Sequence, residues 1–238
     1  GVAAVNLLQL QPEEKITSII HSPRNENENG YLFMATTKGV VKKTPIDKYA
    51  NIRTNGLISI TLDDGDELRY IRRTSGKDEL ILSTSAGQAV RFDENDIRPM
   101  GRSARGVRGV RLRPNDWVVG MDVISDASKK ILVISKNGYG KMTNVNLFAA
   151  HKRGGVGIKA ATVTAKTGPI ITARTVCDDA EELLMISEKG QTIRVGINDV
   201  PSLGRTTQGV RIMRLNDGDA VASIGILMKE DAEIKEED

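Results

Sequence analysis

The stretch from Glu79 to Asp96, ELILSTSAGQAVRFDEND, contains two short apolar runs on either side of a glycine turn. The runs are Glu79–Thr84 and Gln88–Phe92, the turn is Ser85–Gly87, and four polar residues close the unit. Short aliphatic runs bounded by Gly, Asn and Asp are typical of a β-hairpin. The same order of residues recurs along the chain, and this repetition decides the fold.

Two series of glycines mark the repeat. The first series is Gly56, Gly106, Gly157 and Gly209, and the second is Gly39, Gly87, Gly138 and Gly190. Each unit also contains a third apolar run, such as Val107–Leu112, and a fourth, such as Trp117–Ile124. Four strand-like runs in about 50 residues match the size of a propeller blade. The sequence therefore predicts an all-β, propeller-like ring or array of four-stranded blades.

We predict one repetitive domain over residues 1–228, with a half repeat at 1–29 and full repeats at about 30–77, 78–127, 128–179 and 180–228. The half repeat matches only the second half of a unit. Because the chain starts inside a repeat and without Met, we expect it to be a fragment of a longer protein. Residues 229–238 form an acidic tail that we predict to be disordered.

Composition excludes several classes of protein. No apolar run approaches the roughly 18 residues of a membrane span, and the first residues lack the layout of a signal peptide. Cys177 is the only cysteine, so neither an internal disulfide nor a Cys-based zinc site can form. The two histidines, His21 and His151, form no catalytic or metal-binding pattern. We expect no catalytic residues, no metal and no cofactor in this chain, and a cytoplasmic location.

Charge is distributed unevenly along the chain. The formal net charge is +3, but the tail 229–238 carries six acidic residues against two lysines, so the rest of the chain has a net charge of +7. A basic body indicates a polyanionic partner, and an acidic tail could compete with it for the same surface. The alternative is that the tail only improves solubility.

Basic residues recur at the same points of each repeat. Those near the two glycine series are Lys42, Lys43, Arg53, Arg91, Arg102, Lys141, Arg153, Arg194 and Arg205, and their neighbours include Arg105, Arg108, Lys152, Lys159 and Arg211. The glycines of the two series, and likewise Gly154 and Gly155, let the backbone come close to a phosphate and expose its N–H groups, and the cations supply charge. Ordinary solvated turns are the alternative, but four copies of the pattern favour a continuous DNA-binding track.

Aromatic residues favour duplex over single-stranded DNA as the partner. Trp, Tyr and Phe make up only 3% of the chain, whereas single-strand binders offer aromatic faces on which bases stack. Cations on phosphates hold a duplex without reading its sequence. We therefore predict non-specific binding of duplex DNA with bending, which costs on the order of 1–6 kcal/mol for 40–90°.

Four segments carry a resemblance to a known family: Phe33–Thr44, Gly106–Leu112, Asn137–Thr143 and Gly204–Val210. Over essentially its whole length, the chain resembles the C-terminal domain of the bacterial DNA gyrase A protein. The resemblance implies a β-pinwheel, whose blades exchange strands, with DNA wrapped around a basic rim. It also implies as partners the remainder of gyrase A, which cleaves DNA, and gyrase B, which uses ATP and Mg²⁺. The complex would introduce negative supercoils in the bacterial cytoplasm, in association with the nucleoid.

The chain departs from this family in one motif. The family's wrapping motif, close to Gln-Arg-Arg-Gly-Gly-Lys-Gly, lies in the first blade, whereas the similar stretch His151–Gly157 lies in a later repeat and lacks the first Gln and the last cation. Because the family ring typically has six blades, we expect the first blade to be missing. The alternatives are the corresponding domain of topoisomerase IV, a propeller scaffold for protein partners, and an enzyme built on a propeller.

Overall fold

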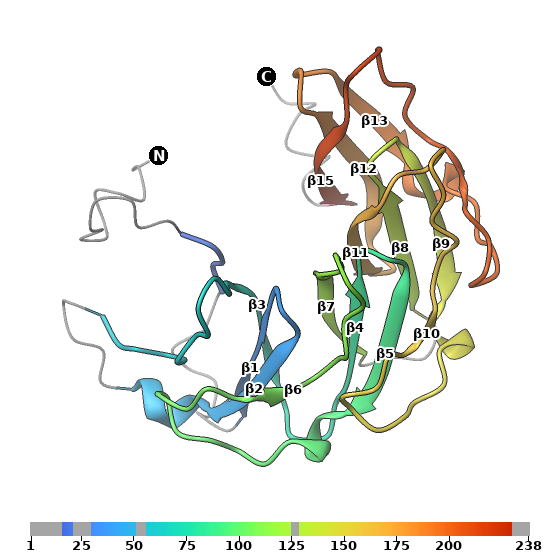
Figure 1. Ribbon diagram of the computed structural model, residues 1–238. Helices are drawn as coiled ribbons and strands as arrows, with labels where there is room; N and C mark the ends of the chain where they lie inside the picture. The colour runs from blue at the N-terminus through green and yellow to red at the C-terminus, as the bar shows by residue number, and fades with distance from the viewer. Residues whose placement is uncertain (1–15, 21–29, 51–55, 125–128, 230–238) are drawn as a thin grey trace.

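A computed structural model describes residues 16–20, 30–50, 56–124 and 129–229. Most of the half repeat at 1–29, Arg53 and the tail after Lys229 lie outside the described residues, so the predictions made for them stay predictions. The described chain is all-β, as predicted, and its sheets follow one another in a curved array (Figure 1).

The first sheet shows how each unit is built. Strands β1 (Tyr31–Thr36) and β2 (Val40–Pro45) form an antiparallel hairpin around the turn at Gly39. Strand β3 (Leu68–Thr74) pairs with the other side of β1, and β6 (Val107–Arg108) pairs with the free side of β2. The sheet order is therefore β3-β1-β2-β6.

The other sheets repeat this plan. The second sheet contains β7 (Val118–Ile124), β4 (Glu79–Thr84), β5 (Gln88–Asp93) and β10 (Ile158–Lys159). The third contains β11 (Ile170–Val176), β8 (Lys130–Ser135), β9 (Tyr139–Asn144) and β14 (Val210–Arg211). The fourth contains β15 (Val221–Met228), β12 (Ala180–Ser187) and β13 (Thr192–Gly196), and within the described residues no strand pairs with the outer edge of β13.

A short 3-10 helix follows the second strand of each hairpin. These helices are η2 (Ile46–Tyr49), η3 (Glu94–Asp96), η4 (Val145–Leu147) and η5 (Ile197–Asp199). Asp93 and Asn144 cap the amides of η3 and η4, as expected for Asp and Asn at a helix start. We had predicted only that residues 93–96 form the polar end of a run.

The third run of each of the last three repeats joins the sheet of the preceding repeat, whereas the third run of the first full repeat, residues 57–62, forms no strand. Strand β6 comes after β5 in the chain but pairs with β2, and β10 and β14 likewise pair with β5 and β9. This strand exchange is what the family resemblance implied. We had assigned all four runs of a unit to one blade, and that assignment is wrong for the third run. Only two residues of Val107–Leu112 form ladder pairs, and these lie in the neighbouring sheet.

The apolar cores lie between successive sheets. Phe33 and Val41 of the first sheet pack with Leu80, Phe92 and Met121 of the second, and all five are buried. The rings of Phe33 and Phe92 have centroids 6.2 Å apart. Similar clusters join the second sheet to the third and the third to the fourth. Each sheet therefore needs its neighbours in order to bury its faces, as in other repeat proteins.

Glycines permit the donated strands to approach the neighbouring sheet. Gly106, Gly157 and Gly209 have φ values of +97°, +80° and +83°. An added Cβ at these positions would lie 2.6, 2.3 and 2.5 Å from carbonyl oxygens of the neighbouring hairpin. We had interpreted these glycines as allowing the backbone to approach a phosphate. At these three positions, the close approach is instead between one repeat and the next.

Gly157→Ala should lower the free energy of unfolding by about 3 kcal/mol, because left-handed backbone strain of about 1–2 kcal/mol adds to overpacking of about 1–3 kcal/mol. Gly56 is a matched control, since its φ is +76° and nothing lies within 4 Å of its Cβ position. Gly56→Ala should cost only about 1 kcal/mol from the strain alone. Urea unfolding of both variants measures the difference. Equal losses would show that contact between repeats does not restrict position 157.

Candidate nucleic-acid interface

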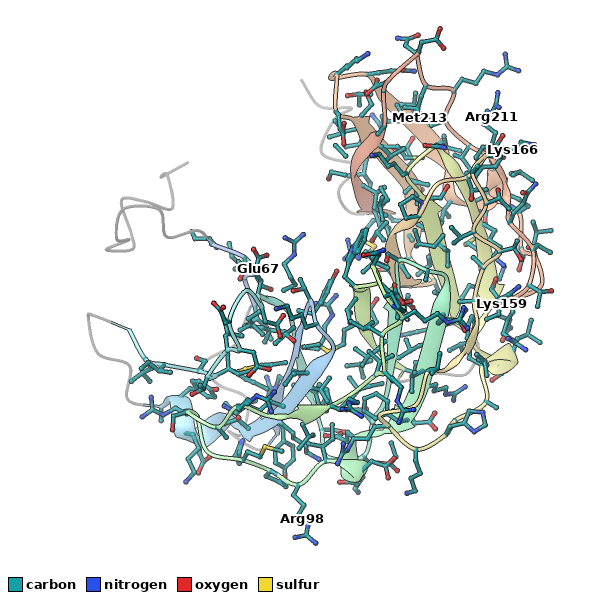
Figure 2. The ribbon with its side chains drawn as sticks, viewed as in Figure 1. Glu67, Arg98, Lys159, Lys166, Arg211 and Met213 are labelled. Carbon is teal, nitrogen blue, oxygen red and sulfur yellow. The ribbon has the colours of Figure 1, made fainter. Side chains whose placement is uncertain are left out.

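Each donated strand carries an exposed cation at its second residue. Arg108 lies opposite Val40, Lys159 opposite Gln88, and Arg211 opposite Tyr139. The three cations therefore occupy equivalent places on the outermost strands of three successive sheets, and all are exposed. We call them the rim row. Figure 2 shows Lys159 and Arg211 along the same outer side of the array.

Tyr139 holds Arg211 in place. The guanidinium Nη2 donates to the Tyr139 hydroxyl over 3.0 Å, and the Arg211 Cζ lies 5.5 Å from the ring centroid. Lys166 Nζ lies 5.4 Å from the same ring, and Figure 2 shows it beside Arg211. The hydrogen bond from Arg211 lowers the pKa of the Tyr139 phenol. Because this partner is a neutral phenol and not a carboxylate, it does not neutralise the charge of Arg211, which stays available to an anion.

The junction of the first two sheets contains a basic hollow of about 430 Å³. Its lining includes Lys38, Arg105, Arg108, Arg111 and one acid, Asp63. Arg105 makes a bidentate ion pair with Asp63, which lowers the pKa of that carboxyl. Arg108 and Arg111 are exposed, so the hollow keeps a positive charge that suits a phosphate.

The basic loops before the donated strands use part of their hydrogen-bonding capacity internally. Arg153 Nη1 donates to the Arg108 carbonyl over 2.9 Å, and Arg205 Nη1 donates to the Lys159 carbonyl over 2.5 Å. Arg102, at the equivalent position of the preceding repeat, is also half-buried. Arg153 therefore connects its loop to Arg108 of the rim row, and Arg205 connects its loop to Lys159.

The stretch that resembles the wrapping motif is held by its backbone. The Gly154 amide donates to the Gly109 carbonyl over 2.6 Å, and the Gly155 carbonyl accepts from the Arg111 amide over 2.8 Å. Lys152 is 90% exposed and forms an ion pair of 2.6 Å with Asp96. The Gly154 amide and the Gly155 carbonyl are therefore bonded within the protein and not to a phosphate. The exposed positive charge of this loop comes from Lys152.

Three predicted DNA contacts are wrong, because Lys42, Lys43 and Lys141 are 0%, 1% and 1% exposed. They lie on the second strands of hairpins, which face the following repeat. Lys43 forms an ion pair of 2.9 Å with buried Glu94. Lys42 and Lys141 donate to backbone carbonyl groups. A phosphate outside the array cannot reach these ammonium groups.

Burial is the main influence on the pKa of the two carbonyl-bound lysines. It lowers the pKa of Lys42 to about 8, with a further contribution from the charge of Arg102. Burial and then the charge of Arg205 lower the pKa of Lys141 to about 8 in the same way. Both amines are therefore still mostly protonated at pH 7.

Arg91 and Arg194 are paired with acids of their own sheets. Arg91 bonds Glu79 and also donates to the carbonyls of Val145 and Phe148 over 3.1 Å each. Arg194 bonds Glu182 and is exposed. A DNA contact by either residue stays a prediction, and the neighbouring carboxylate weakens its attraction for phosphate.

Sequence reasoning did not select Lys38 and Lys166. Lys38 directly precedes Gly39, so the glycine series could have indicated it. Lys166 lies in a turn after the third run and aligns with no recurring cation. Only its position above the Tyr139 ring relates it to Arg211.

Lys43→Met should lower the free energy of unfolding by about 3 kcal/mol, because it leaves a buried carboxylate without its cation. Glu94 would keep only its bonds from Thr74 and from the amides of Gly76 and Asp78. Lys48, which is 56% exposed, is the control, and Lys48→Met should change stability little. Thermal unfolding measures both. A Lys43 variant as stable as the parent would contradict the structural role assigned to the ion pair.

A family model described as "DNA gyrase C-terminal domain, beta-propeller" matches residues 30–75, 78–125, 129–177 and 181–227. The chain belongs to this family. Among curated relatives, it is 38% identical over 232 residues to the DNA gyrase A protein of Staphylococcus epidermidis, and 39% identical over 239 residues to that of Staphylococcus aureus. These alignments cover 97% and 100% of the chain but only 26% and 27% of the relatives, so the chain spans about a quarter of their length.

Solved structures of type IIA topoisomerase domains share the fold. A DNA gyrase A C-terminal domain aligns with a TM-score of 0.82 at 24% identity, covering 94% of this chain and 74% of that one. A C-terminal domain of DNA topoisomerase IV aligns with a TM-score of 0.88 at 26% identity, covering 97% and 72%. These comparisons confirm the gyrase-type fold that the sequence resemblance implied.

The described residues contain neither a membrane-spanning helix nor a cluster of metal-binding side chains. None of their helices has the length and apolar character needed to cross a membrane. In the same ranges, no three His, Cys, Asp or Glu side chains are grouped closely enough to hold a metal ion.

Proposed function

We propose that this chain binds duplex DNA along the rim row and bends it, as a non-catalytic part of DNA gyrase. The observation that carries the proposal is the rim row itself, in which strand exchange puts one exposed cation at the same place on each of three sheets. Cations repeated at structurally equivalent points suit a polyanion followed along its backbone. Contacts to phosphate carry no sequence information, so binding is non-specific.

Bending follows from the curvature of the array. A duplex that contacts Arg108, Lys159 and Arg211 in turn must follow successive sheets, whose arrangement is curved (Figure 1). Smooth bending of a short site costs about 1–6 kcal/mol. Counterion release at each neutralised phosphate offsets this cost, and it also makes binding strongly dependent on salt. The basic hollow that Arg108 helps to line is one binding place for a phosphate.

The proposed parent is a complete gyrase. The remainder of gyrase A would cleave DNA, and gyrase B would hydrolyse ATP with Mg²⁺. This chain would supply the bent DNA segment for strand passage, which introduces negative supercoils. The location would be the bacterial cytoplasm, in association with the nucleoid.

The likeness to a topoisomerase IV domain supports a second candidate. In that case, the chain would bend DNA less as part of topoisomerase IV. The full-length protein, reconstituted with its ATPase partner in the presence of ATP, distinguishes the two. Negative supercoiling of relaxed plasmid supports gyrase, whereas decatenation without supercoiling supports topoisomerase IV.

Binding to a duplex of a few tens of base pairs should weaken steeply with salt, with a matched single strand competing poorly. Arg108→Gln, Lys159→Gln and Arg211→Gln should each lower the slope of log K against log salt by about 1, because each removes one phosphate contact. Arg174, an exposed arginine on inner strand β11, is the control, and Arg174→Gln should leave the slope unchanged. Fluorescence anisotropy across a salt series measures all four.

Equal slopes for all four variants and the parent would contradict the rim row as the DNA-binding surface. No binding of duplex at low salt would contradict the proposed function of the chain itself. It would leave a role as a scaffold for protein partners as the better explanation.

A further inference from the structure

Buried lysines hold the basic loops that precede the donated strands. Lys141 Nζ donates to the carbonyls of Gly204 and Arg205 over 2.7 Å each, and to the Thr207 hydroxyl over 3.2 Å. All three acceptors belong to the loop that precedes β14. An ammonium group has three donors, so this single loop satisfies Lys141 completely.

The first junction repeats this arrangement. Lys42 Nζ donates to the Arg102 carbonyl and, over 2.5 Å, to the Ser59 carbonyl. Arg102 and Arg205 are equivalent, since each lies four residues before a glycine of the first series. At both junctions, a buried lysine therefore binds the main chain of the loop arginine.

Threonine hydroxyls add a second equivalent contact. Thr61 Oγ1 donates to the Ser103 carbonyl over 2.6 Å, and Thr162 Oγ1 donates to the Thr206 carbonyl over 2.6 Å. Each acceptor is the residue directly after the loop arginine. The main chain at that arginine and just after it is therefore held, while its side chain stays half-buried near the surface.

The middle junction is an internal contrast. Val90 occupies the place of the lysine, three residues after Gly87. There the loop is held by its own cation, because Arg153 Nε donates to the Asp96 carbonyl over 3.1 Å and Lys152 pairs with Asp96. At this junction, which lacks the buried lysine, the loop is therefore held by its own cations, Arg153 and Lys152.

Neither Lys42 nor Lys141 takes part in any ion pair among the described residues. Burying a cation with only neutral partners is costly. The chain nevertheless retains one at two equivalent junctions, which indicates a role that an apolar side chain would not fill. The contact common to both lysines is the hydrogen bond to a main-chain carbonyl of the basic loop.

We propose that Lys42 and Lys141 are positioning residues, which hold the basic loop of the following repeat in the form that presents Arg102 or Arg205 to DNA. The part of this proposal that concerns DNA rests on the proposed function. The lysines act through the loop and do not touch the duplex. Their effect on binding must therefore depend on the loop arginine.

The first test needs no DNA. In Lys141→Met, backbone amides of residues 204–209 should exchange hydrogen more than about tenfold faster, because the loss of a single charged hydrogen bond corresponds to about tenfold and Lys141 makes three such bonds to this loop. The first two sheets should exchange as in the parent. Thr207→Val removes one acceptor of the same ammonium without removing charge, together with the bond of 2.9 Å from the Thr207 hydroxyl to the Gly204 carbonyl. It should show a smaller increase in the same segment. Lys136→Met, at an exposed lysine of the same repeat, is the control and should show none.

The second test is a double-mutant cycle on duplex affinity. Lys141→Met and Arg205→Gln should each weaken binding several-fold, and the double variant should bind about as well as Arg205→Gln alone, because interacting residues are not additive. Losses that simply multiply would overturn the coupling of Lys141 to Arg205.

The outcomes separate the two proposals. Unchanged exchange of residues 204–209 in both Lys141→Met and Thr207→Val would overturn the positioning role, whatever the DNA result. If the parent chain binds no duplex but Lys141→Met shows faster exchange in its loop, the positioning role is supported and the proposed function is overturned. If Lys141→Met does not fold, Lys42→Met decides at the first junction, where faster exchange confined to residues 101–106 supports the proposal and unchanged exchange overturns it.

Discussion

The architecture depends on the two-residue pairing by which three successive repeats each donate a strand to the sheet before them. The Gly106 segment pairs with β2 and places the amides of Gly109 and Val110 on the Gly39 carbonyl. The same bonds recur at the next two junctions, where the carbonyls of Gly87 and Gly138 accept two amides each. Few residues make each pairing, but the cores between sheets enclose it, so strand exchange and apolar packing stabilise each other.

Much of the fold could be predicted because its signals are local and periodic. Apolar runs and turn glycines located strand β4 to the residue, and the repeat length indicated the number of strands in a unit. The partner of the third run could not be predicted from the residues alone. A two-residue strand carries no alternation to indicate which sheet it joins, and only the family resemblance implied an exchange.

The candidate site was predicted less completely, for a physical reason. Sequence periodicity shows that a cation recurs, but it does not show which way the cation points. On β2, Lys42 and Lys43 are adjacent and point to opposite faces, and both are buried. Lys42 bonds the main chain of Ser59 and Arg102, and Lys43 pairs with Glu94 of the following repeat. Arg108, Lys159 and Arg211 are exposed because each lies on the edge strand of its sheet, beyond which no other strand pairs in the described part of the chain. Conversely, Lys166 has no periodic signal, and only the folded chain brings it to Arg211.

Strand exchange also fixes the spacing of the charges in the rim row. The spacing between its charges is set by the step from one sheet to the next rather than by the length of any loop, since each charge lies on a strand fixed in the ladder of another repeat. Gain or loss of one whole repeat would therefore lengthen or shorten the charged edge by a constant increment and leave the phase of the remaining charges unchanged. An array of this kind can vary its reach in units of one blade, without redesign of any individual contact.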